Sequence, residues 1–175
     1  WADHAESYLD EVRALVQTSL LKAWAAAWAT RLGVQDQDVD RIKYGLIDPF
    51  FRAFAGWDLS RSLRTMCDFP TYEGDVHSFA ERIARDAATK APHAASVSDL
   101  AAWLETYRAK LTAEGRPTSH VAMHMKRANP RFVLRNWITD LVAEQLASSN
   151  DTKLLERVRA MCAAPFEAYD APDDA

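Results

Sequence analysis

The sequence contains no segment of useful length in which apolar and polar residues alternate, the pattern that marks a half-buried β-strand. Apolar residues instead recur every three or four positions, as on one face of an α-helix, and one such stripe consists of Leu100, Trp103, Leu104, Tyr107 and Leu111. Only five glycines occur among 175 residues, and alanine, the strongest helix former, is abundant. We therefore predict an all-α fold, a compact array of about eight helices.

Capping residues, glycines and prolines indicate where these helices begin and end. Ser78 and Ser96 each open a capping-box pattern with an acidic residue three positions later, and Asp58 or Ser60 fits as another N-cap. Pro49 should kink or break the second helix, because proline removes a backbone donor and clashes with the preceding turn. The expected helices cover residues 6–32, 36–55, 58–67, 78–90, 96–114, 117–127, 129–147 and 152–164.

The length of the chain suits one domain with a hydrophobic core. We expect residues 1–165 to form a single helical domain and residues 166–175 to form an acidic tail. Because the chain begins with Trp1 rather than Met, we also expect it to be a processed, excised or truncated part of a larger protein. Two apolar sets are expected to face the core: Phe132, Val133, Trp137, Ile138 and Leu141, and Leu154, Leu155, Val158 and Met161.

The charge and hydropathy of the chain argue against two classes of partner. The net charge is −4 and the pI is near 5.7, whereas a nucleic-acid-binding domain is usually basic. No apolar run approaches the roughly 20 residues that span a bilayer, and the charged N-terminus does not resemble a signal peptide. We therefore expect neither a nucleic acid nor a membrane as partner. Cys67 and Cys162 are expected to be reduced core thiols, with one long-range disulfide as the alternative.

A search for catalytic or metal-binding motifs assigns no residue. The chain has no P-loop, GxGxxG, GxSxG or HExxH pattern. His120 and His124 are one helical turn apart, but no neighbouring acid or cysteine completes a metal site, so we expect ordinary surface or partly buried histidines. The acids near one loop region are explained by helix capping or solvation: Asp58, Asp68, Glu73 and Asp75. We predict no catalytic, cofactor-binding or metal-binding residue in this chain.

The stretch "NPRFVLRNW", residues 129–137, is more polar than a plain core helix requires. Asn129 suits an N-cap and Pro130 the first helical position, so Arg131 and Arg135 should share one helix face. Arg127 lies four positions earlier and extends the series of arginines. These guanidiniums could pair with carboxylates of the same domain, remain solvated or bind an anion. We interpret the following residues as a docking element or a possible anion contact: Asn129, Pro130, Arg131, Arg135 and Asn136.

This stretch resembles the "NPKYVLRN" signature of the selenoprotein O (SelO) family of protein adenylyltransferases, which are pseudokinases. Other stretches of the chain resemble further elements of the family and follow in the same order: "WATRLGV", "WDLSRSLR", "WLETYRAKL", "MHMKRANP" and "LLERVRAMCAAPFEAYDAP". The resemblance covers nearly the whole chain, and the signature stretch is its most specific part. Two departures are that residues 58–60 lack the usual Tyr and Thr, and that Leu63 replaces the Phe before Arg64.

The resemblance implies a larger enzyme with a protein-kinase-like fold that transfers AMP from ATP to Ser, Thr or Tyr hydroxyls of proteins. ATP and Mg²⁺ are the implied cofactors of that full-length enzyme, and its catalytic residues belong to an N-terminal kinase-like domain that no stretch here matches. The implied partners are therefore that domain and the protein substrates. The family's C-terminal Cys-x-x-Cys or selenocysteine motif is also unmatched. A mitochondrial or cytoplasmic location is implied by the resemblance only.

The resulting expectation is a C-terminal helical region without transferase activity of its own, which supports the kinase-like part. Two alternatives remain open from the residues. One is a stand-alone helical protein-interaction module without enzymatic activity. The other is an anion-binding or regulatory domain that uses the series Arg127, Arg131 and Arg135.

Overall fold

The computed structural model describes residues 2–87 and 94–167. These two ranges contain helices joined by turns and no β-strand, which confirms the all-α prediction. The expected acidic tail falls mainly on residues 168–175, outside the described ranges. The elements are α1 (Ala2–Arg31), α2 (Val39–Ile42), the π-helix η1 (Lys43–Ile47), α3 (Asp48–Ala53), α4 (Leu59–Met66), the 3₁₀-helix η2 (Phe69–Thr71), α5 (Val76–Ala87), α6 (Ala94–Glu114), α7 (Thr118–Ala128), α8 (Asn136–Ser149) and α9 (Lys153–Ala163).

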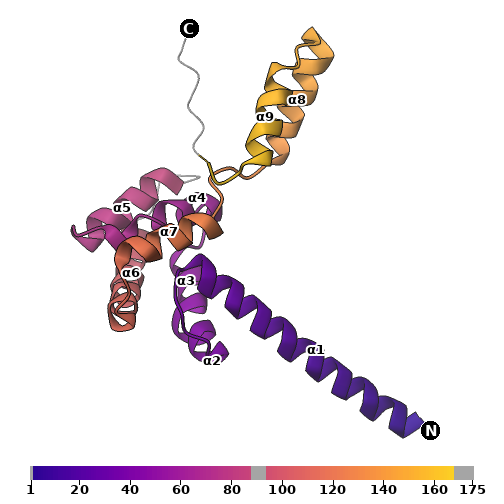
Figure 1. The fold of residues 1–175 in the computed structure, drawn as a ribbon, viewed down its shortest axis with the longest axis vertical. Coiled ribbons are helices and arrows are strands. Elements are labelled where there is room, and N and C mark those ends of the chain that lie inside the picture. The colour runs from indigo at the N-terminus through magenta and orange to yellow at the C-terminus, as the bar shows by residue number, and fades with distance from the viewer. Residues whose placement is uncertain (1, 88–93, 168–175) are drawn as a thin grey trace.

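The helices form a central body with two projections (Figure 1). The body contains α2 to α7, and the C-terminal end of α1 joins it by packing against α2 and α7. The rest of α1 extends from the body as a single rod, while α8 and α9 pack against each other and extend as a two-helix arm (Figure 1). The hydrophobic core lies in the body, so both projections leave much of their own surface uncovered.

Aromatic rings fill the centre of the body. Phe50 of α3 is fully buried, with its ring centroid 4.1 Å from that of Phe54, 5.3 Å from Trp103 and 5.5 Å from Trp28. Trp103 also donates a hydrogen bond from its indole nitrogen to the Leu46 carbonyl at 3.1 Å. Such ring pairs contribute beyond the area they bury, and the bonded indole is satisfied inside the core. This cluster joins α1, α3 and α6.

Pro49 does not break the second predicted helix. The chain instead forms α2, continues through the π-helix η1 and enters α3 with Pro49 in its first turn. A proline in the first turn of a helix is tolerated because the backbone nitrogen there needs no intrahelical acceptor. A π-helical turn contains one residue more than an α-helical turn. The chain passes through such a turn at Lys43–Ile47, so the helical path continues where the sequence predicted a kink or break.

Several helix boundaries differ from the predicted ones. Helix α5 begins at Val76, and Asp75 rather than Ser78 caps its N-terminus. The Asp75 carboxylate accepts a hydrogen bond from the Ser78 backbone nitrogen at 2.8 Å. The helix predicted from Ser96 begins earlier, at Ala94. The largest error concerns the helix predicted from Asn129, because α8 begins only at Asn136.

None of the predicted core residues on the arm is buried, and they range from half-buried to largely exposed. Val142 is the only buried residue of α8, and α9 has none among the residues described. Trp137 is 64% exposed and Leu141 47% exposed, although their helical spacing predicted a core face. Cys67 is buried but Cys162 is exposed, and both are free, so the prediction of two reduced thiols holds while their burial was wrong for Cys162.

Gly33 allows α1 to end against α7. Its φ of +67° is in the left-handed region, where a residue with a Cβ is strained. A Cβ at this position would lie 2.8 Å from Val121 Cγ1 and 2.8 Å from Met125 Cγ, both on α7. Glycine is therefore required here for the turn and for the close approach of the two helices.

We predict that Gly33→Ala destabilises the chain more than Gly115→Ala does. Gly115 has a similar φ of +65°, but no atom of the described residues lies within 4 Å of a Cβ added there. Both substitutions incur the left-handed penalty of about 1–2 kcal/mol, and only Gly33→Ala adds overpacking of about 1–3 kcal/mol. Thermal denaturation of both variants measures the difference, and equal losses would contradict the proposed close packing of α1 on α7.

Asp68 forms an ion-pair network between three elements, whereas the sequence suggested a solvated side chain. It follows α4 and contacts Arg82 of α5 at 2.7 Å and Lys126 of α7 at 2.9 Å. Burial alone would raise the pKa of Asp68, but the hydrogen bonds and charges of Lys126 and Arg82 outweigh it and hold the pKa below its usual 3.8. The charged form of Asp68 therefore stabilises the folded chain.

The stabilisation by Asp68 should be present above the unfolded-state pKa near 3.8 and be lost as pH falls through the lower folded-state pKa. We therefore expect the melting temperature of Asp68→Asn to lie below that of the parent chain at pH ~6 and to approach it at pH ~3. Melting curves across this range provide the measurement, with Asp40→Asn, at an exposed position, as the control. A gap between parent and Asp68→Asn that does not change with pH would show that charge on Asp68 is not the cause.

Candidate functional site at the α7–α8 junction

Asn129 is the buried polar residue at the centre of this junction, with 1% of its surface exposed. Its Nδ2 donates hydrogen bonds to the carbonyls of Arg31, at 2.7 Å, and Met125, at 3.0 Å. Its Oδ1 accepts a bond from Arg31 Nε at 3.3 Å. Asn129 therefore ties the C-terminal end of α1 to the C-terminal end of α7. A buried amide that lost these partners would cost about 1–3 kcal/mol.

Arg64 of α4 reaches the same place from the other side. Its Nη1 donates to the carbonyls of Lys126 and Asn129, both at 3.1 Å. The last carbonyls of α7 have no intrahelical donors, and a cation there also complements the negative end of the helix dipole. Arg64 thus completes the C-terminus of α7 and fastens it to α4.

Cys67 lies beside Asn129 and does not act as a reactive thiol. Burial raises the pKa of Cys67, and this effect exceeds the opposite effect of the hydrogen bond from Asn129, whose Nδ2 is 3.7 Å from the sulfur. Its thiol also donates to the Leu63 carbonyl at 3.2 Å. Because nucleophilic cysteines are thiolates, a buried thiol with a raised pKa has a packing role here.

The chain from Pro130 to Arg135 is not helical, which contradicts the predicted helix start. The backbone nitrogens of Arg131 and Phe132 donate to the Pro165 carbonyl at 2.7 and 3.0 Å. Asn129 cannot act as an N-cap, because its side chain is committed to α1 and α7, and its backbone ends α7 instead. The prediction that Arg131 and Arg135 share a helix face is therefore wrong.

Arg135 is the N-terminal boundary residue of α8 and pairs with a carboxylate of the same body. Its Nη2 donates to both oxygens of Asp58, at 2.9 and 2.8 Å. Asp58 Oδ1 also accepts from the Arg61 backbone nitrogen at 3.0 Å, so Asp58 caps α4 as predicted. The pair connects the start of the arm to α4. Asn136, the first residue of α8, has an exposed side chain.

A pocket of about 220 Å³ lies where α4 begins and α8 begins. Its lining includes Arg61, Arg131 and the Arg135–Asp58 pair, together with Ser60 and apolar side chains. Arg61 and Arg131 form no side-chain hydrogen bond or ion pair with the residues that the structure describes. The pocket therefore combines one neutralised ion pair with two guanidiniums that are available to an anion. Arg127, at the end of α7, does not line it.

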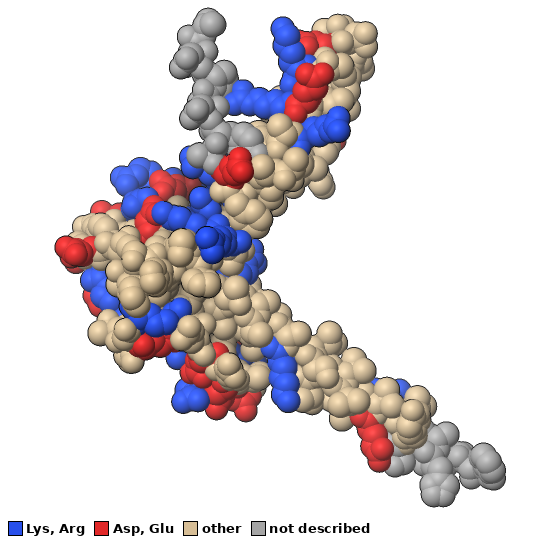
Figure 2. Space-filling model, in the orientation of Figure 1, with Lys and Arg blue, Asp and Glu red and all other residues tan. Residues whose placement is uncertain are grey.

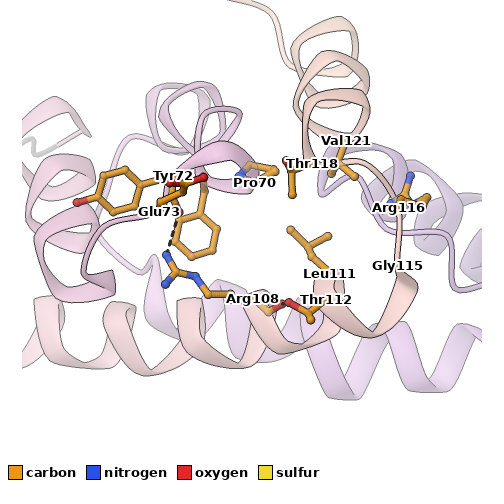
Figure 3. Close-up of a pocket in the computed structure, with 11 residues that line it drawn as sticks. Pro70, Tyr72, Glu73, Arg108, Leu111, Thr112, Gly115, Arg116, Thr118 and Val121 are labelled. Atoms are coloured by element: carbon orange, nitrogen blue, oxygen red, sulfur yellow. Dashed lines mark hydrogen bonds between the residues drawn. The ribbon is translucent and has the colours of Figure 1, made fainter.

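A larger pocket of about 490 Å³ lies between η2, the end of α6 and the start of α7 (Figure 3). Its arginines are already engaged. Arg108 donates to the carbonyls of Tyr72 and Gly74, each at 3.3 Å, and Figure 3 shows the bond to Tyr72. Arg116 pairs with Glu114 at 2.8 Å. These cations hold loops together, so this pocket offers less to an anion than the smaller one.

The other sequence candidates are not brought together. His120 and His124 are exposed, and no group of three or more His, Cys, Asp or Glu side chains in the described ranges could hold a metal ion. None of the helices in those ranges combines the length and hydrophobicity that a membrane crossing requires. Sequence reasoning missed Arg31 and Arg64 as partners of Asn129, because long-range partners leave no local pattern in a single sequence.

Comparison with known proteins relates the chain to one family. The family model described as protein adenylyltransferase SelO matches residues 1–163. A protein nucleotidyltransferase YdiU of Ralstonia nicotianae is 38% identical over 68 residues, which cover 39% of this chain and 13% of that protein. Proteins of the same name are 37% identical over 68 residues in Myxococcus xanthus (39% of this chain and 14% of that protein) and 32% identical over 80 residues in Nitrosospira multiformis (46% and 14%). The chain thus aligns with a small part of each of these curated relatives.

We predict that Asn129→Ala lowers the free energy of unfolding by about 1–3 kcal/mol, because the Arg31 carbonyl and guanidinium lose a buried partner. Asn136→Ala is the matched control, since it removes the same amide at an exposed position and should change stability by less than about 0.5 kcal/mol. Chemical denaturation of both variants gives the comparison. If the two variants were equally stable, Asn129 would not be the residue that fastens α1 to α7.

Proposed function

Because the chain belongs to the family of the protein adenylyltransferase SelO, we propose that it is the C-terminal helical region of a larger protein nucleotidyltransferase. Its role is to support the part of the polypeptide that carries the chemistry. The family is one of protein nucleotidyltransferases, as the names of the matched relatives state. The matched segments cover only 13–14% of the length of these two relatives, which is consistent with a chain that is one part of such an enzyme.

The activity that we propose for the complete enzyme is transfer of AMP from ATP to hydroxyl groups of proteins. ATP and Mg²⁺ would then bind in a kinase-like part outside this chain. The supporting role is carried by the apolar surface of the two projections.

The rod of α1 has one such surface. Figure 2 shows few charged side chains along the face of α1 in view. Leu20 is 64% exposed, Leu15 is 67% exposed and Val16 is 49% exposed. An isolated helix gains little stability in water without packing of its apolar face, so a projecting rod of this composition requires a covering partner. Among the side chains of α1 that the structure describes, the large apolar ones that are exposed are Tyr8, Leu9, Val12, Leu15, Val16, Leu20 and Leu21.

The arm has a second uncovered surface near the α7–α8 junction. Leu134 is 45% exposed and lies in the non-helical segment that connects the body to α8, and Trp137, in the first turn of α8, is 64% exposed. Figure 2 shows an uncharged face along the arm, beside a face with charges of both signs. Scattered exposed apolar residues are ordinary, but contiguous ones on both projections are typical of an interface. We propose that the remaining part of the enzyme covers both surfaces.

A stand-alone helical interaction module is the competing function. It would use the same two surfaces for a separate protein and would have no enzyme attached. The reading frame upstream of Trp1 distinguishes the two, because only the first proposal requires it to encode a kinase-like domain. Transfer of AMP by the isolated 175-residue chain would overturn the supporting role altogether.

We predict that Val16→Glu/Leu20→Glu leaves the stability of the isolated chain nearly unchanged but destabilises the longer enzyme. Both positions are on one face of α1 and are exposed in this chain, so the double variant should change its stability by less than about 0.5 kcal/mol per residue. In the longer enzyme the two carboxylates would be buried, and stability should fall by more than about 2 kcal/mol.

Thermal denaturation of both proteins tests this prediction, together with AMP transfer by the longer one. Thr18→Glu, on the opposite face of α1, is the control that adds charge without entering the proposed interface. If the double variant had no effect in the longer enzyme, α1 would not dock through this face.

A further inference from the structure

We propose that the pocket lined by Arg61 and Arg131 receives an acidic side chain from the polypeptide that docks on this chain. This inference rests on the proposed function, since it names a contact within the same interface. The pocket lies at the base of the arm, where the non-helical segment 130–135 leaves the body. The occupant is a peptide segment with an Asp or Glu carboxylate next to an apolar residue.

The charges around the pocket identify an anion as the missing partner. Asp58 is the only acid in the lining, and its two oxygens already accept bonds from Arg135 and from the Arg61 backbone. Arg61 and Arg131 also line the pocket, and no carboxylate of the described residues pairs with either side chain. A guanidinium can bind a carboxylate with two parallel hydrogen bonds, and Ser60 adds a hydroxyl to the same lining.

The size and the rim of the pocket favour a peptide side chain over a nucleotide or a free ion. A volume of about 220 Å³ is smaller than the roughly 300–1,000 Å³ of typical small-molecule sites. The rim includes Val133, 36% exposed, and Trp137, 64% exposed, both in the lining, and Leu134 is exposed between them. An inorganic anion would use the arginines and leave these apolar side chains in water. A carboxylate with an apolar neighbour would use both.

The continuity of the surface supports the same occupant. The uncovered face of α8 begins at Trp137, inside the pocket lining, and continues to Leu141. A partner that covers this face must pass the two guanidiniums. Burial of an unpaired guanidinium is costly, so the partner would need an acid at this point. The apolar face thus sets where the partner lies, and the arginines set the charge of the residue that it places there.

The test uses the full 175-residue chain and two probe peptides, acetyl-Leu-Glu-Leu-amide and acetyl-Leu-Gln-Leu-amide. Binding is followed by the NMR signal of the Trp137 indole N–H, assigned with Trp137→Phe. We expect the Glu peptide to shift this signal and the Gln peptide to leave it unchanged. Arg61→Gln/Arg131→Gln should weaken binding at least about tenfold, as expected for the loss of charge-assisted hydrogen bonds. Arg127→Gln, on an exposed arginine outside the pocket, should have no effect.

Three outcomes would overturn the inference. Equal shifts by both peptides would mean that the apolar rim alone binds. If inorganic phosphate shifted the Trp137 signal with the same affinity as the Glu peptide, the pocket would be a plain anion site. The third concerns the acids of segment 168–175, which lies outside the described residues. The chain's own acids would be the occupant if Asp170→Asn/Asp173→Asn/Asp174→Asn shifted the Trp137 signal without any peptide. That shift would have to disappear when Arg61 and Arg131 are also replaced.

The peptide experiment and the test of the proposed function can have different outcomes, because they probe different surfaces. The peptides probe only the pocket, whereas Val16→Glu/Leu20→Glu probes α1 in the longer enzyme. No peptide binding together with a destabilised longer enzyme would overturn the acidic contact and leave the docking of α1 intact. Peptide binding together with no effect of the α1 variant would support the contact and remove the proposed docking face of α1.

Discussion

The buried amide of Asn129 is the contact on which the arrangement of this chain depends. Its donors and acceptor join the end of α1 to the end of α7, and Arg64 adds bonds from α4 to the same turn. Three elements far apart in sequence therefore converge on one residue. An amide buried this deeply is tolerated only when its bonds are satisfied, so the three elements cannot separate without leaving a buried polar group unpaired.

The same bonds determine how the arm leaves the body. Since Asn129 is held by α1 and α7, it cannot cap a following helix, and the chain continues without helical structure until Arg135. The backbone nitrogens of Arg131 and Phe132 donate to the Pro165 carbonyl, just beyond the end of α9, and Arg135 is held by Asp58. The segment 130–135 is therefore fixed near both ends. Its side chains form a pocket wall with the start of α4 rather than one face of a helix.

These contacts explain which features could be predicted from the sequence. Helix class, and the approximate extent of α1, α4 and α7, follow from local periodicity and capping. The start of α8 could not be predicted, because Asn129–Pro130 has the local form of a helix start and only the distant Arg31 changes its role. The arginines of the site were identified by residue type, but the pairing of Arg135 with Asp58, 77 positions away, has no local signal. The exposure of Trp137 was missed for a related reason: periodicity reports an apolar face and not what covers it.

The difference between having an apolar face and having that face covered bears on the role of this chain within its family. Helical spacing at Trp137 and Leu141, and along α1, is that of a packed face, yet these side chains are exposed here. A packed pattern without a covering element is the expected signature of a surface that evolved inside a larger assembly. The arginines beside Trp137 extend the argument from shape to charge, because two guanidiniums at the edge of an apolar interface would be destabilising unless the partner neutralised them. If the proposed docking is right, the surface that covers this chain is apolar along α1 and α8 and acidic where α8 begins.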